Sequence, residues 1–492
     1  MAEEKVRVKV HKVLLESERA ELKAKRKRKF LITLLCCALL VVGLVGGYII
    51  SGIQRGASIA PFKTNKLDKI SSYINSIWLY KDDYEDLQGT MEDKAFYGMT
   101  RFEEDPYTTY MSKDEMEEFA SNINMNYVGI GAQYTYSNDM GTIIRVFKNS
   151  PAEKGGMLPG DIIYKVDDTF TSGLDSDQIK ELITGESGTN VRITVLRSGK
   201  ELELTITRGA IEYTAYGEKR DNYVYLSIMS FGESTDEECI EYLNEFKNEK
   251  NIIIDLRDNS GGYQGSVQKV AGLFIGPDKV VLNETDNEGN TKSYKTIGTK
   301  YYDNFKNVVV LINENTASAA EVLSICLKEQ HPNAKLVGTT TYGKGVVQTS
   351  YYLEDGSAIK VTTSYWTSPK GTSINKVGVK PDYEVFLDEI LRASVYSLEE
   401  ENTFELDSVS PYVKVAQMGL KYLDYNVDRE DGYFDESLAL ALKEYKVDND
   451  LEENEILDTI TYDAILSSVI REYNTNLKKD LQLQKAIEVL GE

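Results

Sequence analysis

A serine at the start of a predicted helix is one of two residues in this sequence best suited to covalent chemistry. Ser318 follows an apolar run, 308–312, and precedes a helical pattern, so we expect it on a strand-to-helix turn. The first N–H groups of a helix lack partners within the helix and can stabilise a negative charge on an attacked carbonyl. The small neighbours Ala317, Ala319 and Ala320 leave room for a peptide. Taken alone, a serine here is more often only an N-cap.

The second such residue is Lys344, which lies between Gly343 and Gly345. A lysine can act as a base only after losing its proton, and burial lowers its pKa from the ordinary value near 10.4. The flanking glycines allow the backbone to turn the amine inward, and Gln348 is placed to orient it. A surface lysine in a glycine loop is the alternative. A phosphate-binding P-loop is excluded because Gly345 stands where Ser or Thr is required.

The stretch 255–262, Asp-Leu-Arg-Asp-Asn-Ser-Gly-Gly, is a third candidate cluster. It ends the apolar run 252–256, and the paired glycines Gly261 and Gly262 allow the backbone to approach a substrate closely. Taken alone, the pattern is more often that of an ordinary glycine turn. The three clusters together are therefore more informative than any one of them.

Histidine is too scarce for a histidine-based site. The sequence has only His11 and His331, and its four cysteines form no CxxC pair, so we expect no metal site and no cofactor. His331 lies thirteen residues after Ser318, beyond the predicted helix. That spacing corresponds to about 20 Å along a helix axis. A Ser-His-Asp triad is therefore not expected.

The residues around the three clusters alternate between strand and helix patterns. We expect strands at 223–229, 252–256, 308–312 and 336–338, and helices at 235–248, 265–274 and 318–330. The strands 252–256 and 308–312 are continuous apolar runs, which is typical of a sheet covered on both faces. The expected fold of this part is an α/β core in which the serine and the paired glycines follow strands.

A β-rich segment precedes this core. Strands are expected at 141–146, 161–166, 190–196 and 201–207, with one helix at 177–183. With the Leu-Pro-Gly-Asp turn at 158–161, this order resembles a PDZ domain. The resemblance implies a peptide-binding loop made by Val128, Gly129, Ile130 and Gly131, whose N–H groups would hold a terminal carboxylate. The alternative is a small β-rich packing domain without a ligand.

The N-terminal part predicts a membrane anchor. Residues 30–50 are 21 uncharged residues, enough for a helix of about 31 Å that spans a bilayer core. Six basic residues lie within 23–29, immediately before it, which favours a cytoplasmic N-terminus and an external body. A cleaved signal peptide is the alternative, with Ser58-Ile59-Ala60 as a small-x-small site, although Pro61 would be a poor partner for cleavage.

The three clusters taken in order resemble the C-terminal processing peptidases, tail-specific serine proteases of the S41 type. The shared order is Asp-Pro-Tyr at 105–107, the PDZ-like segment, 255–262, the Ala-Ser-Ala turn and Gly-Lys-Gly-x-x-Gln, and it covers about 66–390. The resemblance implies that Ser318 is the nucleophile, that Lys344 is its general base and that Gln348 positions Lys344. It also implies an oxyanion hole formed by the N–H groups of Ala319 and Gly262, and an acyl-enzyme intermediate.

Three positions depart from this family's pattern. Thr316 and Ala320 stand where many relatives have serine, and we expect no effect from them. Thr184 stands where many relatives carry a basic residue near the PDZ peptide site. The usual coupling between the PDZ domain and the active site is therefore in doubt for this chain.

The C-terminal part has a compact helical pattern with Asp-Gly-Tyr-Phe at 431–434, and it resembles a peptidoglycan-binding module. A packing or dimerisation bundle is the alternative. The expected organisation is a cytoplasmic basic tail (1–29), a transmembrane helix (30–50), a linker (51–65), a helical N-terminal part of the protease (66–115), a PDZ domain (116–210), a protease core (211–390), a linker (391–408), the module (409–470) and a C-terminal helix (471–492).

These observations predict a membrane-anchored serine endopeptidase, single-pass with an external catalytic domain, that cleaves extracytoplasmic proteins whose exposed C-termini bind the PDZ domain. The whole chain carries −23 and residues 2–29 carry +6, so the remainder is strongly acidic and unsuited to nucleic acid. Peptidoglycan is a possible further partner, and the resemblance implies a homodimer. The competing hypothesis is a non-catalytic adaptor that tethers partners to the cell wall.

Overall fold

The structure is a computed structural model that describes residues 65–491 except 138–139, 212, 394–397 and 399–401. The chain divides into two units, residues 1–92 and 93–492. The described part of the first unit holds the helix α2 (Asn65–Ile77), the 3-10 turn η1 (Lys81–Asp83) and the start of α3 (Leu87–Thr100). No described helix is long and apolar enough to cross a bilayer, and the predicted membrane segment 30–50 lies outside the described residues.

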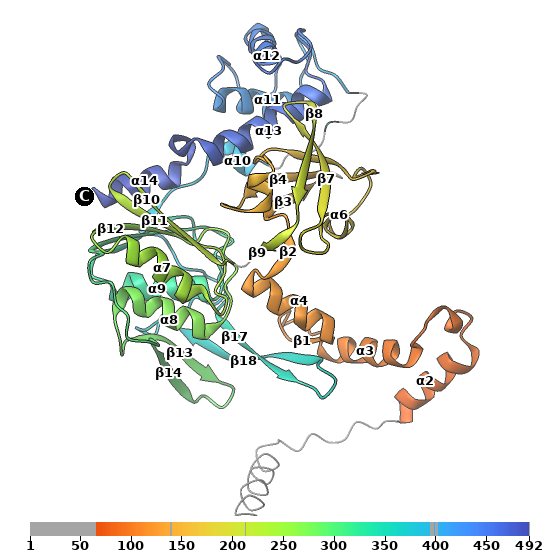
Figure 1. Ribbon diagram of the computed structural model, residues 1–492, viewed down its shortest axis with the longest axis vertical. Coiled ribbons are helices and arrows are strands. Elements are labelled where there is room, and N and C mark those ends of the chain that lie inside the picture. The colour runs from red at the N-terminus through yellow and green to blue at the C-terminus, as the bar shows by residue number, and fades with distance from the viewer. Residues whose placement is uncertain (1–64, 138–139, 212, 394–397, 399–401, 492) are drawn as a thin grey trace, which may run out of the picture. The chain divides into compact units, whose positions relative to one another are not determined.

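A six-stranded, mostly parallel sheet forms the centre of the protease core (Figure 1). Only the edge strand β10 is antiparallel to its neighbour. In sheet order the strands are β10 (Ala215–Arg220), β11 (Tyr223–Ile228), β12 (Asn251–Asp255), β15 (Asn307–Ile312), β16 (Ala334–Gly338) and β19 (Tyr383–Glu384). The four longer strands that sequence patterns predicted are confirmed, with ends shifted by one or two residues.

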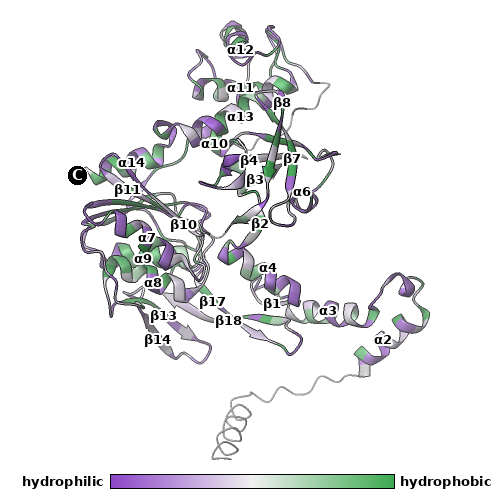
Figure 2. Ribbon diagram, in the orientation of Figure 1, coloured by the Kyte–Doolittle hydropathy of each residue, from purple (hydrophilic) through white to green (hydrophobic). Residues whose placement is uncertain are grey.

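Helices cover both faces of this sheet. They are α7 (Thr235–Glu245), α8 (Gln264–Ile275), α9 (Ala319–Gln330) and α14 (Leu481–Leu490). On β12, Ile252 and Ile254 pack in the cluster that contains α7, α8 and α9, whereas Ile253 packs with α14. Hydrophobic residues are correspondingly dense in α8 and α9 (Figure 2). Burial on both faces explains why the central strands are continuous apolar runs.

A second, antiparallel sheet lies beside the site and was not predicted from the sequence. Its strands are β1 (Thr109–Met111), β13 (Val280–Asp286), β14 (Thr291–Lys295), β17 (Val346–Tyr352) and β18 (Ala358–Thr367). The strand β18 pairs with β1, β13 and β17, so it connects residues far apart in the sequence. The helix α4 (Lys113–Asn124) follows β1 and begins at a capping box formed by Ser112 and Glu115.

The PDZ domain predicted within 116–210 is present, and its strands begin after α4. Its strands are β2 (Tyr127–Gly129), β3 (Ala132–Ser137), β4 (Met140–Val146), β5 (Ile162–Val166), β6 (Thr169–Phe170), β7 (Asn190–Arg197), β8 (Lys200–Thr207) and β9 (Gly209–Ile211), and its helices are α5 (Pro151–Lys154) and α6 (Ser176–Ile183). The alternation of β7, whose Val191, Ile193 and Val195 are fully buried, supplies much of its core.

The C-terminal region is helical and contacts both neighbouring parts. It comprises α10 (Glu389–Arg392), α11 (Pro411–Tyr422), α12 (Glu436–Asp448), α13 (Thr459–Thr475) and η2 (Leu477–Lys479), followed by α14. The PDZ turn at Gly160 packs on α13 so closely that a Cβ there would lie 2.1 Å from the carbonyl oxygen of Ser467. At the core, the buried Arg257 forms an ion pair with Asp480 at 2.9 Å.

Candidate active site

Ser318 lies where β15 turns into α9, as the strand-to-helix pattern predicted. Its backbone has φ 53° and ψ −118°, a conformation that a residue with a Cβ rarely adopts. The turn is fixed by Thr316, whose hydroxyl accepts from the N–H of Asn313 and donates to the carbonyl of Leu256. Strained backbone is typical of functional sites because it costs about 1–3 kcal/mol and persists only where the surroundings enforce it.

Two backbone N–H groups beside Ser318 are available for an oxyanion. They belong to Ala319 and Gly262, and neither donates a hydrogen bond to another described residue. Gly262 has φ 141°, and a Cβ there would lie 2.4 Å from the carbonyl oxygen of Phe231. Only glycine fits this position, so the paired glycines are required by close approach of backbone segments rather than by an ordinary turn.

The glycine loop is held against the serine turn by Asn259, which is fully buried. Its side chain donates to the carbonyl of Ile228 at 2.7 Å and accepts from the N–H of Gly261 at 2.8 Å. Its own carbonyl accepts from the N–H of Ala317 at 2.9 Å. A Cβ on Gly261 would lie 2.7 Å from Cβ of Ser318, so the loop and the turn are in direct contact.

Lys344 is partly buried in the loop after β16. Its Nζ lies 4.8 Å from the ring centroid of Tyr107, and its carbonyl accepts from Nε1 of Trp366 at 2.8 Å. Burial lowers the pKa of Lys344, and the positive charge of Lys360 lowers it further, while Glu321 acts in the opposite direction. Within the described residues, Nζ makes no hydrogen bond to Oγ of Ser318. The amine therefore rests against Tyr107.

Glu321 is a fully buried carboxylate that joins the serine turn to the lysine loop. Its Oε2 accepts from the N–H groups of Ser318 at 2.9 Å and Lys344 at 2.8 Å. Its Oε1 accepts from the N–H of Gly343 at 2.7 Å and the hydroxyl of Thr341 at 2.5 Å. Burial raises the pKa of Glu321 against the effect of these hydrogen bonds. One side chain thus fixes both backbones.

Gln348, predicted to orient Lys344, lies on β17 of the antiparallel sheet, and its side chain contacts β18. Its Nε2 lies 3.4 Å from Oγ1 of Thr362, and that hydroxyl donates to Oδ1 of Asp105 at 3.0 Å. Hydrogen bonds from Thr108 and Thr362 hold the pKa of Asp105 below its usual range although burial acts to raise it. The Asp-Pro-Tyr motif at 105–107 is therefore linked to Gln348 through β18.

One cleft of about 730 Å³ is lined by all five residues of the predicted site: Ser318, Ala319, Gly262, Lys344 and Gln348. It also exposes Lys360, from β18, and Phe119, from α4. The cleft lies at the carboxyl ends of β12, β15 and β16, where the loops of a parallel sheet converge.

A second cavity of about 670 Å³ is lined by Gly129, Ile130 and Gly131 of the PDZ loop. The N–H groups of Ile130 and Gly131 donate no hydrogen bond to another described residue. Thr184 also lines this cavity, and its hydroxyl donates to the carbonyl of Lys180. The two cavities share Asn122, Ser230 and Ser260, so the PDZ groove and the cleft at Ser318 are adjacent.

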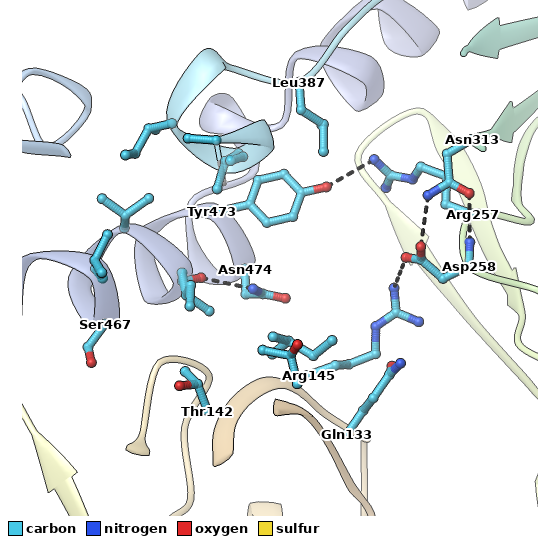
Figure 3. Close-up of a pocket in the computed structure, with 18 of the residues that line it drawn as sticks. Gln133, Thr142, Arg145, Arg257, Asp258, Asn313, Leu387, Ser467, Tyr473 and Asn474 are labelled. Carbon is cyan, nitrogen blue, oxygen red and sulfur yellow. Dashed lines mark hydrogen bonds and ion pairs between the residues drawn. The ribbon is translucent and has the colours of Figure 1, made fainter. Parts of the chain in front are cut away.

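The loop that carries Gly262 is also tied to its neighbours through Asp258 and Arg257 (Figure 3). Oδ1 of Asp258 accepts from Nδ2 of Asn313 at 2.8 Å, and its Oδ2 lies 3.8 Å from Nη2 of Arg145, on β4. Nη1 of Arg257 donates to the hydroxyl of Tyr473, on α13, at 3.3 Å. The PDZ domain and the C-terminal helices thus both contact the residues that precede the glycine pair.

The sequence missed several residues that this geometry brings to the site. Lys360 reaches the cleft on β18, and Tyr107 contacts Lys344 from the residues just before β1, which pairs with β18; no local pattern predicted this pairing. Glu321 was recognisable as the third residue of α9, where a glutamate supports a serine N-cap, but its bonds to the lysine loop are tertiary. His331 ends α9, bonded to the carbonyl of Phe305, and does not line the cleft.

Comparison with known proteins identifies the parts of the chain. Residues 222–385 match the model of peptidase family S41, 128–207 that of the PDZ domain, and 409–465 that of the "putative peptidoglycan binding domain". Carboxy-terminal processing protease CtpA of Bacillus subtilis (strain 168) is 33% identical over 465 residues, which cover 94% of this chain and 97% of that protein.

A second curated relative and a solved structure were also matched. Carboxy-terminal processing protease CtpB of the same organism is 31% identical over 435 residues, or 87% of this chain and 88% of that protein. The solved structure of the photosystem II D1 C-terminal processing protease aligns with a TM-score of 0.43 at 24% identity, covering 64% of this chain and 88% of that one. The chain belongs to peptidase family S41, with carboxy-terminal processing proteases among its relatives, and it carries a PDZ domain and a peptidoglycan-binding domain.

Proposed function

We propose that this protein is a membrane-anchored serine endopeptidase that uses a dyad of Ser318 and Lys344 to cleave extracytoplasmic proteins near their C-termini. The observation that supports this most directly is the single cleft lined by Ser318, Lys344 and two unpartnered backbone N–H groups. Nucleophile, base and oxyanion donors are the parts that acyl transfer requires. Membership of peptidase family S41 and the named relatives support the same reaction.

In the proposed reaction, Oγ of Ser318 attacks the scissile carbonyl while Nζ of Lys344 accepts its proton. The N–H groups of Ala319 and Gly262 stabilise the oxyanion, the amine of the leaving peptide takes the proton, and water hydrolyses the acyl-enzyme. Lys344 can be neutral near physiological pH more readily than an exposed lysine because burial lowers its pKa. The reaction requires Nζ to move from the ring of Tyr107 to the serine hydroxyl.

The assay that tests this proposal compares digestion of an unfolded protein by the full chain, by Ser318→Ala and by Lys344→Ala. Removing either member of a dyad is expected to reduce kcat by roughly 10³-fold or more. Ser187→Ala and Lys335→Ala are matched controls because both residues are exposed and lie outside the cleft. Equal digestion by wild type and both site variants would contradict the dyad and favour the adaptor hypothesis.

The PDZ domain is proposed to hold the substrate's C-terminus. The free N–H groups of Ile130 and Gly131 can bind a terminal carboxylate, and the adjoining cavity leads toward Ser318. We expect the full chain carrying Ser318→Ala to bind a fluorescent peptide with a free C-terminus at least ten times more tightly than its C-terminal amide. Equal affinities would remove carboxylate recognition from the proposal.

The membrane anchor and external location are proposed from the sequence of the N-terminal part. The uncharged stretch 30–50 and the basic residues before it support a single-pass helix with a cytoplasmic N-terminus. A protease added outside intact protoplasts is expected to digest the part of the protein that follows residue 50 and to leave the tail, residues 1–29, intact. Protection of the whole chain would contradict this orientation.

Peptidoglycan is proposed as a partner of the C-terminal helical domain, on the basis of its match to the peptidoglycan-binding model over 409–465. The full chain carrying Ser318→Ala is expected to cosediment with purified peptidoglycan. A chain that remains in the supernatant at all peptidoglycan concentrations would favour a packing role for α11, α12 and α13.

A homodimer is proposed from the apolar face of α2. Leu67, Ile70, Ile74 and Ile77 recur at three- and four-residue spacing, and Ile70 and Ile77 are 55% and 77% exposed in the single chain. Ile70→Asp is expected to convert a dimer to a monomer in sedimentation velocity, whereas Ser72→Asp, on the opposite face of α2, is not. A monomeric wild type would exclude this assembly.

A further inference from the structure

The cleft at Ser318 contains a second lysine, Lys360, that the proposed reaction does not use. Lys360 is the third residue of β18, where it pairs with Ser350 of β17 and Thr109 of β1. Two residues further along the strand, Thr362 is the contact of Gln348. Alternate residues of a strand share a face, so Lys360 projects from the side of β18 that meets Gln348.

No counter-ion accompanies Lys360. Its Nζ lies 4.6 Å from the ring centroid of Phe119, on α4, and it makes no ion pair with any described residue. Glu284, on β13, lines the same cleft but does not pair with it, and its Oε1 has no hydrogen-bond partner. A half-buried ammonium without an anion is costly, and most lysines of this acidic chain are exposed to solvent.

A position in a substrate cleft provides a reason for this arrangement. A peptide lying along the cleft can supply the missing anion, and the phenyl ring of Phe119 keeps the ammonium directed into the cleft when no substrate is bound. We propose that Lys360 is a substrate-binding residue that pairs with a carboxylate of the bound peptide, so that the enzyme prefers substrates with an acidic group near the scissile bond. This inference rests on the proposed protease function and specifies its substrate class.

The carboxylate has two possible sources, an acidic side chain or the C-terminus of the peptide. The two sources can be distinguished with peptides derived from one parent sequence that contains no acidic residue. In one series a single Glu replaces Gln at each of three positions on either side of the scissile bond, with the C-terminus amidated. In the other series the parent carries a free or an amidated C-terminus. The full chain, Lys360→Gln, Lys360→Arg and the exposed-lysine control Lys335→Gln are compared by kcat/KM.

We expect one Glu position to be preferred by about tenfold in the wild type, the size of one charge-assisted hydrogen bond at a partly exposed cation. Lys360→Gln should abolish this preference, while Lys360→Arg and Lys335→Gln retain it. If the terminal carboxylate is the ligand, Lys360→Gln should instead lower the ratio of kcat/KM for the peptide with a free C-terminus to kcat/KM for its amide. Any preference due to the PDZ loop persists in that variant, because its N–H groups are unchanged.

The pH profile gives an independent readout. Lys344 is faced by Lys360 from β18, by Glu321 from α9 and by Tyr107 before β1, and the hydroxyl of Tyr107 in turn contacts that of Tyr342. Because the charge of Lys360 disfavours protonation of Lys344, Lys360→Gln should move the acidic limb of kcat/KM to higher pH, and Lys360→Arg should not. A purely structural role for Lys360 would not produce this shift.

Two results would overturn the inference. The first is a wild type with no preference for Glu at any position and none for a free C-terminus. The second is a preference that Lys360→Gln leaves unchanged in a folded enzyme. Neither outcome affects the proposed dyad, which fails if Ser318→Ala or Lys344→Ala cleaves the same peptides as fast as the wild type does.

Discussion

Replacing Gly261 by alanine should inactivate the enzyme without unfolding it. A Cβ at this position would lie 2.7 Å from Cβ of Ser318 and 3.0 Å from the amide nitrogen of Ala319. Carbon atoms in contact ordinarily lie about 3.5–4.0 Å apart, so the glycine loop and the serine turn must separate by about 1 Å. The substitution therefore displaces the proposed nucleophile and one proposed oxyanion donor together.

The expected loss in rate follows from this displacement. A misplacement of about 1 Å at reacting groups lowers kcat by roughly 10²-fold. Gly261 has φ 110°, so the alanine also adds backbone strain of about 1–3 kcal/mol, which should lower Tm by a few degrees. We expect both changes in the same variant, measured by peptide hydrolysis and by thermal unfolding.

Gly265→Ala is the matched control. This glycine lies in the first turn of α8, four residues further on, and no atom lies within 4 Å of the Cβ that alanine would add. Alanine is favoured over glycine in a helix by roughly 1 kcal/mol, so the control should keep wild-type kcat and gain slightly in Tm. Wild-type kcat in Gly261→Ala, or an equal loss in Gly265→Ala, would refute the reasoning.

Three further predictions concern the base, its anchor and the PDZ contact. The kcat/KM of the wild type should rise with pH to a midpoint below the ordinary lysine pKa of 10.5, because burial lowers the pKa of Lys344; a midpoint above 10.5 would contradict this. Glu321→Gln should move that midpoint to lower pH, because the carboxylate raises the pKa of Lys344. The same variant should have a lower Tm, because the amide nitrogen of Gln cannot accept the hydrogen bonds that Glu321 receives from the N–H groups of Ser318 and Lys344. An unchanged pH profile would exclude the electrostatic effect. Gly160→Ala should lower Tm more than Gly156→Ala, since both glycines have positive φ but only Gly160 meets Ser467; equal losses would show that strain, not packing on α13, dominates.

The parallel sheet could be predicted because its signal is local. The strands β12 and β15 are continuous apolar runs, and each ends in a candidate cluster, so the proximity of the glycine pair and Ser318 followed from sheet geometry alone. The resemblances to an S41 peptidase, a PDZ domain and a peptidoglycan-binding domain are confirmed by the family matches. These parts could be predicted because they carry motifs in a characteristic order along the chain as well as periodic apolar residues.

The antiparallel sheet could not be predicted from periodicity. None of the seven residues of β17 is fully buried, and its sequence, Val-Val-Gln-Thr-Ser-Tyr-Tyr, does not alternate regularly between polar and apolar residues. Its partner β18 carries a bulge beside Val347 and Gln348, which interrupts the period of two. Lys360 reaches the cleft on β18, so no local pattern could place it there.

The contact of Gln348 was also beyond sequence reasoning. The sequence placed Gln348 near Lys344 but not on a strand, whereas Gln348 lies on β17, which begins at Val346. Gln348 and Thr362 are directly opposite each other on β17 and β18, and the side chains of opposite residues lie on the same face of a sheet. This contact therefore follows from the pairing of two strands that no local pattern predicted.

Glu321 explains why the backbones of the proposed dyad are so well fixed while the amine is not. Its carboxylate accepts hydrogen bonds from the N–H groups of Ser318, Gly343 and Lys344, so it fixes the serine turn and the lysine loop relative to each other. Among the described residues no hydrogen bond holds Nζ of Lys344, whose contact is the ring of Tyr107. The lysine side chain has a flexible four-carbon stem, so Nζ can change position while the backbone of the loop stays fixed. In the proposed reaction, Tyr107 is therefore the contact that the amine must leave before it accepts a proton from Ser318.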